Sequence, residues 1–353
     1  MPTASDNFGT VPTLVRTLVG AALLLCLCVV VLGAYVRLSS AGLGCPDWPG
    51  CYGHFTPSGA AADARVLSSP VAGRPLEVGK AWREMVHRYA AGTLGLLILS
   101  LAFIGIFRRR ERVLPARYVT ILFAIVLAQG LLGMLTVTWQ LEPLVVTLHL
   151  LFGFTTLSLL LWLVLSLPGG AHGRRLTPID AVADADAGGM AARARLLATL
   201  GLIVLGVQIA LGGWTSSNYA ALACPDFPTC QAQWWPAGDY LAAFDLRGAS
   251  AHTYEGGVLD APARTAIQFS HRLGALIITI VLLSAALSVL RVREKFAQRA
   301  AGLVLAALTL QLIIGISMVL RGFPLWLATA HSAGAALLLM ATVGLNRALR
   351  RPA

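Results

Sequence analysis

Four of the seven histidines in the sequence fall inside long apolar stretches: His87, His149, His271 and His331. Ionisable side chains are costly within a membrane and usually serve a function there. Each half of the chain holds one pair. Each histidine is expected about six residues, roughly 9 Å, from the outer end of its helix, which places all four at one depth.

Two imidazoles at one depth, on two helices of a bundle, can ligate a haem iron from both axial faces. Zinc or copper usually takes a third or fourth protein ligand at the same point, and none is apparent near these pairs. The pattern therefore predicts two haem-type sites. The alternative is that each histidine only hydrogen-bonds a neighbouring helix.

The two halves differ three residues before the first histidine of each pair, where Glu84 precedes His87 but Gln268 precedes His271. A carboxylate one helical turn from an iron ligand can accept protons or stabilise a developing cation, and an amide cannot. The difference predicts that the N-terminal half does chemistry while the C-terminal half holds a cofactor. Alternatively, Glu84 is an interface residue in the headgroup region.

Arg88 and Arg272 directly follow His87 and His271. A guanidinium is the natural bidentate partner of a carboxylate, so both arginines are candidate contacts of haem propionates. They could equally reach from their helices to the membrane interface.

The four cysteines outside the apolar stretches form two closely spaced pairs, Cys45 with Cys51 and Cys224 with Cys230. Both pairs are expected on the outer, oxidising side, where such pairs form disulfides. A structural role is favoured, and a redox role beside a cofactor is left open.

These residues must be positioned by membrane-spanning helices. The chain of 353 residues is 57% hydrophobic and only 12% charged, which excludes a soluble or a disordered protein. Apolar runs of about 20 residues, long enough to cross about 30 Å of hydrocarbon, number eight. They are predicted at 14–36, 81–107, 117–137, 143–166, 194–216, 265–290, 298–320 and 325–347.

Most lysines and arginines lie in the short connections and ends that fall on one side of these spans, including Arg108–Arg112. The positive-inside rule then puts both termini in the cytoplasm and the long segments 37–80 and 217–264 outside. The net charge of +11 therefore sets topology, and a nucleic-acid partner is not expected.

The chain repeats itself. Residues 33–51 align without gaps to 212–230, and His87-Arg88 matches His271-Arg272. Gln129-x-x-x-Gly133 matches Gln311-x-x-x-Gly315, and His149 matches His331. The predicted fold is therefore an all-α integral membrane protein, with eight transmembrane helices forming two tandem, pseudo-symmetric four-helix bundles. The expected parts are 1–166, a linker 167–193, and 194–353.

Eight spans in two halves, Glu84-x-x-His87-Arg88, the other three histidines and the external cysteine pairs together resemble haem A synthase. The resemblance covers roughly 14–347. That family oxidises the C8 methyl group of haem O to a formyl group, by two hydroxylations and loss of water, to give haem A for cytochrome oxidase. The segments 54–80 and 231–264 cannot be matched to it.

The resemblance implies roles for these residues. His271 and His331 would be axial ligands of a resident haem b, His87 and His149 would bind substrate haem O, and Glu84 would be catalytic. The implied setting is a bacterial plasma membrane. Implied partners are the lipid bilayer, a haem O synthase (protohaem farnesyltransferase) and an unidentified electron acceptor, and a homo-oligomer is left open.

Two other classes fit part of the pattern. A di-haem b-type membrane cytochrome that only transfers electrons would need no carboxylate in one half alone, which Glu84 argues against. A transporter built on a parallel repeat would not need two intramembrane histidine pairs.

Overall fold

The computed structural model describes residues 11–63, 65–66, 75–167, 185–246, 251–291 and 294–350. Within them it is all-helical, and its only β-type pairings are two isolated bridges in the external segments. Eight helices are long and apolar enough to cross a membrane. They are α1 (Thr13–Leu38), α4 (Val78–Phe107), α5 (Ala116–Thr138), α6 (Pro143–Ser166), α7 (Ala185–Ser217), α9 (Ala261–Leu290), α10 (Lys295–Leu320) and α11 (Leu325–Leu349).

These eight helices confirm the eight predicted spans, most of them to within a few residues. The largest difference is at α7, which begins at Ala185 instead of 194. The preceding residues include several alanines, and alanine continues a helix readily beyond the apolar run. The predicted linker 167–193 lies outside the described residues over 168–184.

Two helices that carry histidines begin with a capping carboxylate and have a proline in their first turn. Glu142 accepts a hydrogen bond from the Val145 N–H (2.7 Å) at the start of α6, and Asp260 accepts one from Ala263 (2.9 Å) at the start of α9. Such caps satisfy N–H groups that have no partner within the helix, and proline fits the first turn because it lacks one. The outer ends of α6 and α9 are thereby fixed.

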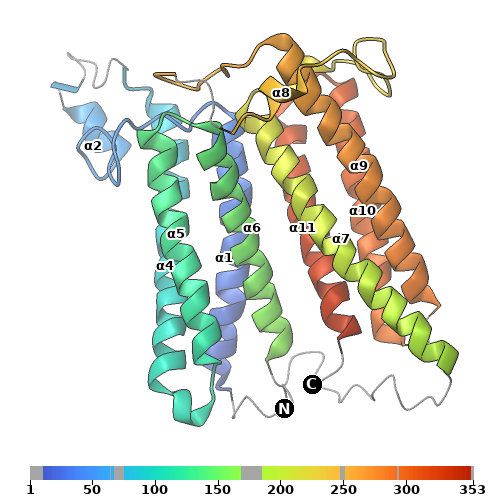
Figure 1. Cartoon of the computed structure of the whole chain (residues 1–353). Coiled ribbons are helices and arrows are strands. Elements are labelled where there is room, and N and C mark those ends of the chain that lie inside the picture. The colour runs from blue at the N-terminus through green and yellow to red at the C-terminus, as the bar shows by residue number, and fades with distance from the viewer. Residues whose placement is uncertain are drawn as a thin grey trace.

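The helices group as the repeat predicts. Helix α1 packs against α4 and α6, and α5 packs against the same two; in the second half, α7 and α10 each pack against α9 and α11. Helices α6, α7, α1 and α11 join the halves (Figure 1). This arrangement is compatible with two tandem four-helix bundles.

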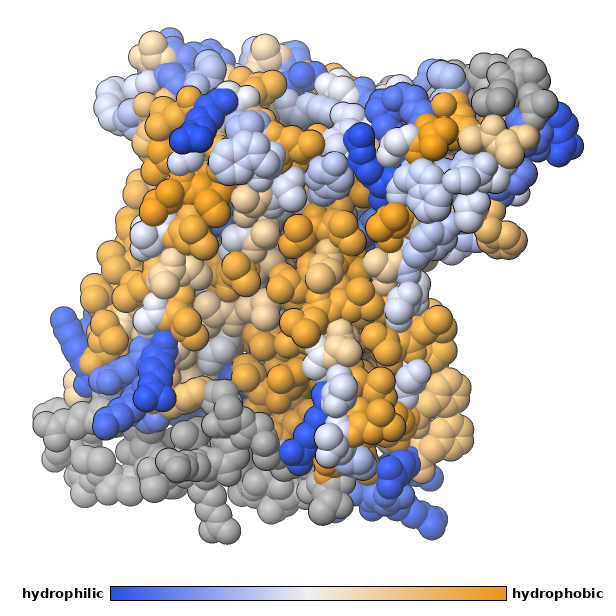
Figure 2. All heavy atoms as spheres, turned by 180° about the vertical axis from the view of Figure 1, so that it is seen from behind, coloured by the Kyte–Doolittle hydropathy of each residue, from blue (hydrophilic) through white to orange (hydrophobic). Residues whose placement is uncertain are grey.

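On the face shown in Figure 2, apolar side chains form a belt over the helices, with hydrophilic residues concentrated toward the two ends. Exposed leucines such as Leu24, Leu131, Leu196 and Leu303 belong to this outer surface. In water such a surface would drive aggregation, whereas in hydrocarbon it is matched to its surroundings. The chain is a multi-pass membrane protein.

The segments expected outside the membrane contain short helices that the sequence did not predict: α2 (Pro57–Ala62), η4 (Ala221–Ala223) and α8 (Tyr240–Ala243). They lie at the end of the bundle opposite the start of α1 and the end of α11 (Figure 1). One contact from this layer links the halves, because the Tyr254 N–H donates to the Gln140 carbonyl (3.0 Å).

The outer ends of the two halves are also tied by side chains. Arg37, near the end of α1, donates to the Ser216 carbonyl at the end of α7 (2.8 Å) and stacks on the Tyr219 ring. Thr147 in α6 contacts Ser217 in α7 through their hydroxyls (3.3 Å). Polar contacts thus join the two halves at their outer ends, and at the opposite end the Trp162 ring of α6 lies under the guanidinium groups of Arg347 and Arg350.

Candidate functional site

The four histidines lie on α4, α6, α9 and α11, at matched positions in the two halves. His149 and His331 each lie six residues into their helices, as predicted. His87 and His271 lie nine and ten residues in, because α4 and α9 begin about one turn earlier than the sequence predicted. The match between halves holds, and the expected single distance of about six residues is wrong for α4 and α9.

The structure brings the C-terminal pair together. The rings of His271 and His331 have centroids 6.5 Å apart, with their planes at 80°. Two metal–nitrogen bonds of about 2 Å each, plus the distance from nitrogen to ring centre on both sides, give a similar separation. This spacing fits one iron between two imidazoles.

Three of the four imidazoles have an Nδ1 atom that is buried without a hydrogen-bond partner: those of His87, His149 and His331. All four residues are nonetheless partly exposed overall. A buried ring nitrogen without a partner is costly, so such sites usually hold a ligand, a metal or water. Among the described residues there is no cluster of three or more metal-ligating side chains, so the donors are paired imidazoles, which suit haem iron.

Each imidazole lies against a glycine of the preceding long helix. A Cβ built on that glycine would lie 2.9 to 3.2 Å from the ring Cε1 of the histidine. The four pairs are Gly33 with His87, Gly133 with His149, Gly212 with His271, and Gly315 with His331. Any side chain there would push the imidazole away, so these glycines set the ring positions.

Three glutamines, each one turn before such a glycine, reach the neighbouring histidine. The amide nitrogens of Gln129, Gln208 and Gln311 donate to the main-chain carbonyls of His149, His271 and His331 at 2.9, 3.0 and 3.0 Å. Sequence analysis matched two of these Gln-x-x-x-Gly segments as repeats but assigned them no role. The signal that could have found them is the same spacing at Gln208 and Gly212.

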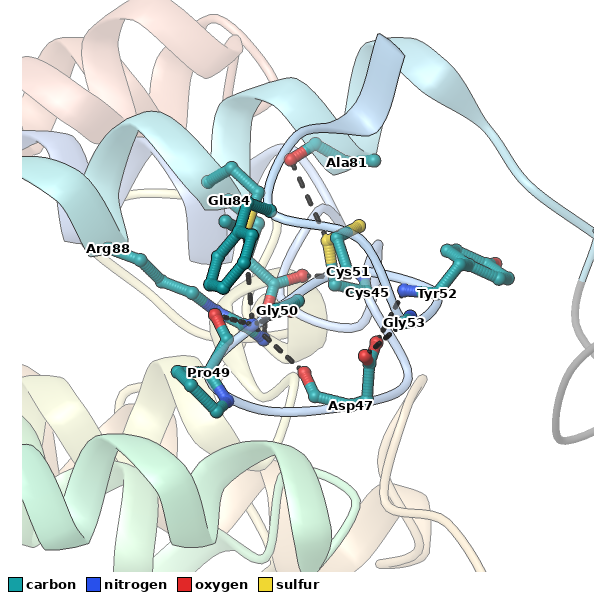
Figure 3. The surroundings of a disulfide bond; sticks show 12 residues. Cys45, Asp47, Pro49, Gly50, Cys51, Tyr52, Gly53, Ala81, Glu84 and Arg88 are labelled. Atoms are coloured by element: carbon teal, nitrogen blue, oxygen red, sulfur yellow. Dashed lines mark hydrogen bonds and ion pairs between the residues drawn. A yellow bond between two sulfur atoms is a disulfide. The ribbon is translucent and has the colours of Figure 1, made fainter. Parts of the chain in front are cut away.

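Glu84 is buried and faces the first disulfide loop, residues 45–51 (Figure 3). One carboxylate oxygen accepts the Cys45 N–H (2.9 Å), and the other pairs with the Arg88 guanidinium (2.5 Å). Glu84 lies one turn from His87 on α4, as predicted. Its carboxylate is also held by the loop, a contact that could not be predicted from the spacing along the chain.

Arg88 completes this contact by donating to main-chain carbonyls of the same loop, those of Asp47 (2.9 Å) and Gly50 (2.5 Å) (Figure 3). Arg272 does the same in the second half, where it donates to Asp226 (2.8 Å) and Thr229 (2.6 Å). Both arginines therefore fasten an external loop onto a histidine-bearing helix. Their contact with haem propionates stays a prediction.

The second loop, residues 224–230, lacks a carboxylate from its helix. Arg272 there donates directly to the Cys224 carbonyl (2.7 Å), while Gln268 is buried with its amide oxygen unpaired. The Thr229 hydroxyl of this loop first, and then the N–H groups of Ala232 and Gln231 just after it, lower the pKa of Asp226 to about 2. Asp226 is thus an ionised anchor of the loop at neutral pH.

Both predicted disulfides are present, Cys45–Cys51 and Cys224–Cys230. Each closes a short loop at the outer end of a histidine-bearing helix. In the first half the Cys45 N–H contacts Glu84, so disulfide, carboxylate and arginine form one connected unit above His87.

The external segment 54–80, which the sequence could not place, contributes to a cavity of about 110 Å³ at the outer surface. Its lining includes Tyr52, Glu77, Lys80 and Glu255. None of the four histidines lines it, so this cavity is separate from the paired imidazoles.

Comparison with known proteins places these features in a family. A model of the family described as cytochrome oxidase assembly protein (COX15-CtaA) matches residues 16–343. A protein named Heme A synthase from Shewanella oneidensis is 42% identical over 91% of this chain and 92% of its own length. Proteins of the same name from Rhizorhabdus wittichii and Halalkalibacterium halodurans are 29% and 25% identical over 92% and 85% of this chain, and 90% and 85% of their own.

The family match spans all eight long helices and therefore both histidine pairs and both disulfide loops. The chain belongs to the COX15-CtaA family of cytochrome oxidase assembly proteins.

Proposed function

We propose that the protein is a haem A synthase, an enzyme that oxidises the C8 methyl group of haem O to a formyl group. The observation that carries the proposal is the pair of imidazoles 6.5 Å apart in the C-terminal half, in a chain whose other half repeats the same positions. Relatives named Heme A synthase, matching about nine-tenths of the chain at up to 42% identity, support it.

The two halves take different roles in this proposal. Residues 1–166 form the substrate half, in which His87 and His149 bind haem O. Residues 194–353 form the cofactor half, in which His271 and His331 hold haem b, and 167–193 connects them. The paired imidazoles, the glycines beneath them and the buried Nδ1 atoms fit both groups. Haem b, when bound, supplies one-electron transfer.

Converting the methyl group to a formyl group through two successive hydroxylations and loss of water has the net balance –CH3 + H2O → –CHO + 4 H+ + 4 e−, in which water supplies the oxygen atom and an electron acceptor takes the electrons. Protons must be accepted in a site with little water. Glu84 is the carboxylate nearest His87 along α4, and its ion pair with Arg88 keeps a negative charge beside the substrate half. That charge can accept a proton or stabilise positive charge on the carbon being oxidised.

The proposed function also predicts the location of the enzyme, its orientation in the membrane and its partners. Both termini face the cytoplasm of a bacterial plasma membrane, and the disulfide loops face outward, where disulfides persist. Haem O arrives from a haem O synthase through the bilayer, and electrons leave to an acceptor that the residues do not identify.

The direct test is to express the protein in a host that makes haem O but no haem A, then extract and separate the haems. We expect haem A in membranes that carry the protein and haem b in the purified protein. The His149→Ala variant should keep haem b but make no haem A.

Two results would count against the proposal. Haem b without any haem A would favour the di-haem cytochrome that only transfers electrons. Purified protein without any haem would exclude both functions.

A further inference from the structure

The two disulfide loops contact α4 and α9 at the depth of the histidines. Both disulfides are buried, and they pack against Met85 in α4 and Phe269 in α9. Each of these residues stands two positions before a histidine of the candidate sites, on a helix apolar enough to span a membrane. The loops therefore lie against the outer part of the membrane-spanning helices.

Other contacts place the loops at the same depth. The arginines that bond the loop carbonyls directly follow the histidines His87 and His271. Tyr89, one residue further along α4, donates its hydroxyl to the Phe55 carbonyl. In the second half the Trp235 ring meets the ring of the α9 phenylalanine edge-on, with centroids 5.0 Å apart.

Each loop carries exposed aromatic side chains at positions that repeat between the halves. We call 45–55 and 224–234, each a disulfide loop with four further residues, the two aromatic loops. Their matched exposed rings are Trp48 and Phe227, 45% and 42% exposed, and Phe55 and Trp234, 86% and 76% exposed. Both pairs are related by the displacement of the sequence repeat. Large rings at such exposure are unfavourable in water and mark an interaction surface.

The charged side chains of the aromatic loops already have partners. Each loop has one aspartate and no glutamate, lysine or arginine. Asp47 accepts two main-chain N–H groups of its loop, at 2.6 and 2.8 Å, and Asp226 accepts two of its own, at 2.6 and 3.0 Å. The histidine of the first loop, His54, contacts Asp63 at 3.2 Å.

Much of the main chain of the loops is bonded as well. Cys51 with His54, and Cys230 with Gln233, exchange both of their N–H···O bonds at 2.8 to 3.1 Å. The arginine that follows each histidine takes three carbonyls of its loop. Irregular backbone is tolerated at membrane depth only where its polar groups are satisfied, and these bonds meet much of that requirement.

The aromatic loops are continuous with the lipid-facing surface. On α4 the exposed side chains Tyr89, Leu96 and Phe103 recur on one face below the first loop, and on α9 Leu276 and Leu283 do so below the second. Helices α4 and α9 lie on opposite sides of the molecule (Figure 1). A bilayer meets both sides at one height, whereas a single partner protein would cover one of them.

We propose that the two aromatic loops anchor the protein in the outer leaflet, where their exposed rings enter the boundary between headgroups and acyl chains. Aromatic rings are enriched at this depth of a membrane. The anchors fix the height of α4 and α9, and with it the height of the imidazoles, relative to the bilayer. This proposal concerns lipid and does not rest on the proposed function.

Spin labels at single introduced cysteines test the depth of the loops. Cys26→Ala and Cys28→Ala first remove the free cysteines, and the disulfides do not react without a reductant. Phe55→Cys or Trp234→Cys is then labelled, and the full-length protein is reconstituted in phosphatidylcholine vesicles. Collision of the label with oxygen, which concentrates in the bilayer, is compared with collision with a water-soluble nickel chelate.

Leu131→Cys, on the lipid-facing surface of α5, and His252→Cys, exposed in the external segment 251–260, are the controls. We expect the oxygen-to-nickel collision ratio at positions 55 and 234 to be several-fold above that at 252 and to approach that at 131. The measurement needs no haem, so it holds whether or not the protein makes haem A.

A collision ratio at 55 and 234 equal to that at 252 would place the loops in water and overturn the proposal. Low collision with both reagents would show that protein, such as a second copy of the chain, covers the rings, and would also overturn it. If a label at either position disturbs the size-exclusion profile, Trp48→Cys and Phe227→Cys give the same measurement at the other pair of rings.

Discussion

Glu84 and Arg88 show how one side-chain difference separates two similar halves. In the first half the arginine bonds the loop both directly and through the carboxylate, and in the second half the arginine bonds the loop without a carboxylate. The buried negative charge is therefore not needed to hold such a loop. This supports a chemical role for Glu84 in addition to its structural contacts.

Replacing Glu84 with glutamine tests that role. We expect folded protein with normal resident haem and bound haem O, and haem A formation reduced by about 10²-fold or more, the usual scale for losing one acid–base group. The measurement is the rate of haem A formation by chromatography. Gln268→Glu is the matched control and should leave the rate unchanged.

Near-normal haem A formation by Glu84→Gln would show that the carboxylate only holds the loop and has no chemical role. Loss of the resident haem from that variant would show a folding defect, which the Gln268→Glu control should not share.

The glycines under the imidazoles give a second prediction at this scale. Gly315→Val places a branched side chain where a Cβ alone would be 3.0 Å from the His331 ring. Overpacking of this kind costs about 1–3 kcal/mol, and here it displaces a proposed iron ligand. We expect loss of most of the low-spin haem signal per purified protein.

Gly302 supplies the control because it lies on the same helix with no atom near its Cβ position. Gly302→Val should keep normal haem content. Equal haem content in both variants would mean that contact with glycine does not set the position of the His331 ring.

At the scale of elements, the external loops act as clamps on the outer ends of α4 and α9. Each is closed by a disulfide, fastened by an arginine and turned about an aspartate, Asp47 or Asp226. Because Arg88 and Arg272 follow the histidines in sequence, the loops and the imidazoles are positioned by the same helical turns.

The second loop should tolerate mild acid. The pKa of Asp226 is lowered to about 2 by the Thr229 hydroxyl and backbone N–H groups, so its contribution to loop stability is full above its ordinary pKa. That contribution is lost only as pH falls through about 2. When the protein is treated with a phosphine, we expect the fraction of the Cys224–Cys230 disulfide that is reduced at pH 4 to be no larger than the fraction at pH 7.

The Cys224–Cys230 disulfide of the Asp226→Asn variant should be reduced more readily than that of the wild type at both pH values, because the asparagine amide is a weaker acceptor for the same N–H groups. Opening of the wild-type loop between pH 7 and pH 4 would contradict the assignment of Asp226 as its anchor.

The eight helices could be predicted from the sequence because membrane spans are read from length and apolar composition. The external elements α2 and α8 could not, since they depend on packing against segments distant in sequence, α2 against α4 and α8 against α9. The four histidines were found because charge is costly in a membrane. The glycines and glutamines beside the histidines carry no such cost, so their importance could be predicted only from their repetition in the two halves.

For the molecule as a whole, the repeat yields two sites of similar construction with unequal side chains. Glu84 distinguishes the first half, where Gln268 stands in the second. Helices α1, α6, α7 and α11 pack the halves into a continuous apolar core. The proposed function assigns the resident cofactor to one half and the reacting substrate to the other.

This division of labour between halves is the central claim, and four alanine variants test it most directly. Absorption spectra of the purified variants and haem chromatography of the same membranes give resident haem and haem A together. We predict that His271→Ala and His331→Ala lose the low-spin b-type spectrum, because each removes one of two axial ligands. His87→Ala and His149→Ala should keep that spectrum and make no haem A. An unchanged low-spin spectrum in both His271→Ala and His331→Ala would contradict the assignment of the two halves.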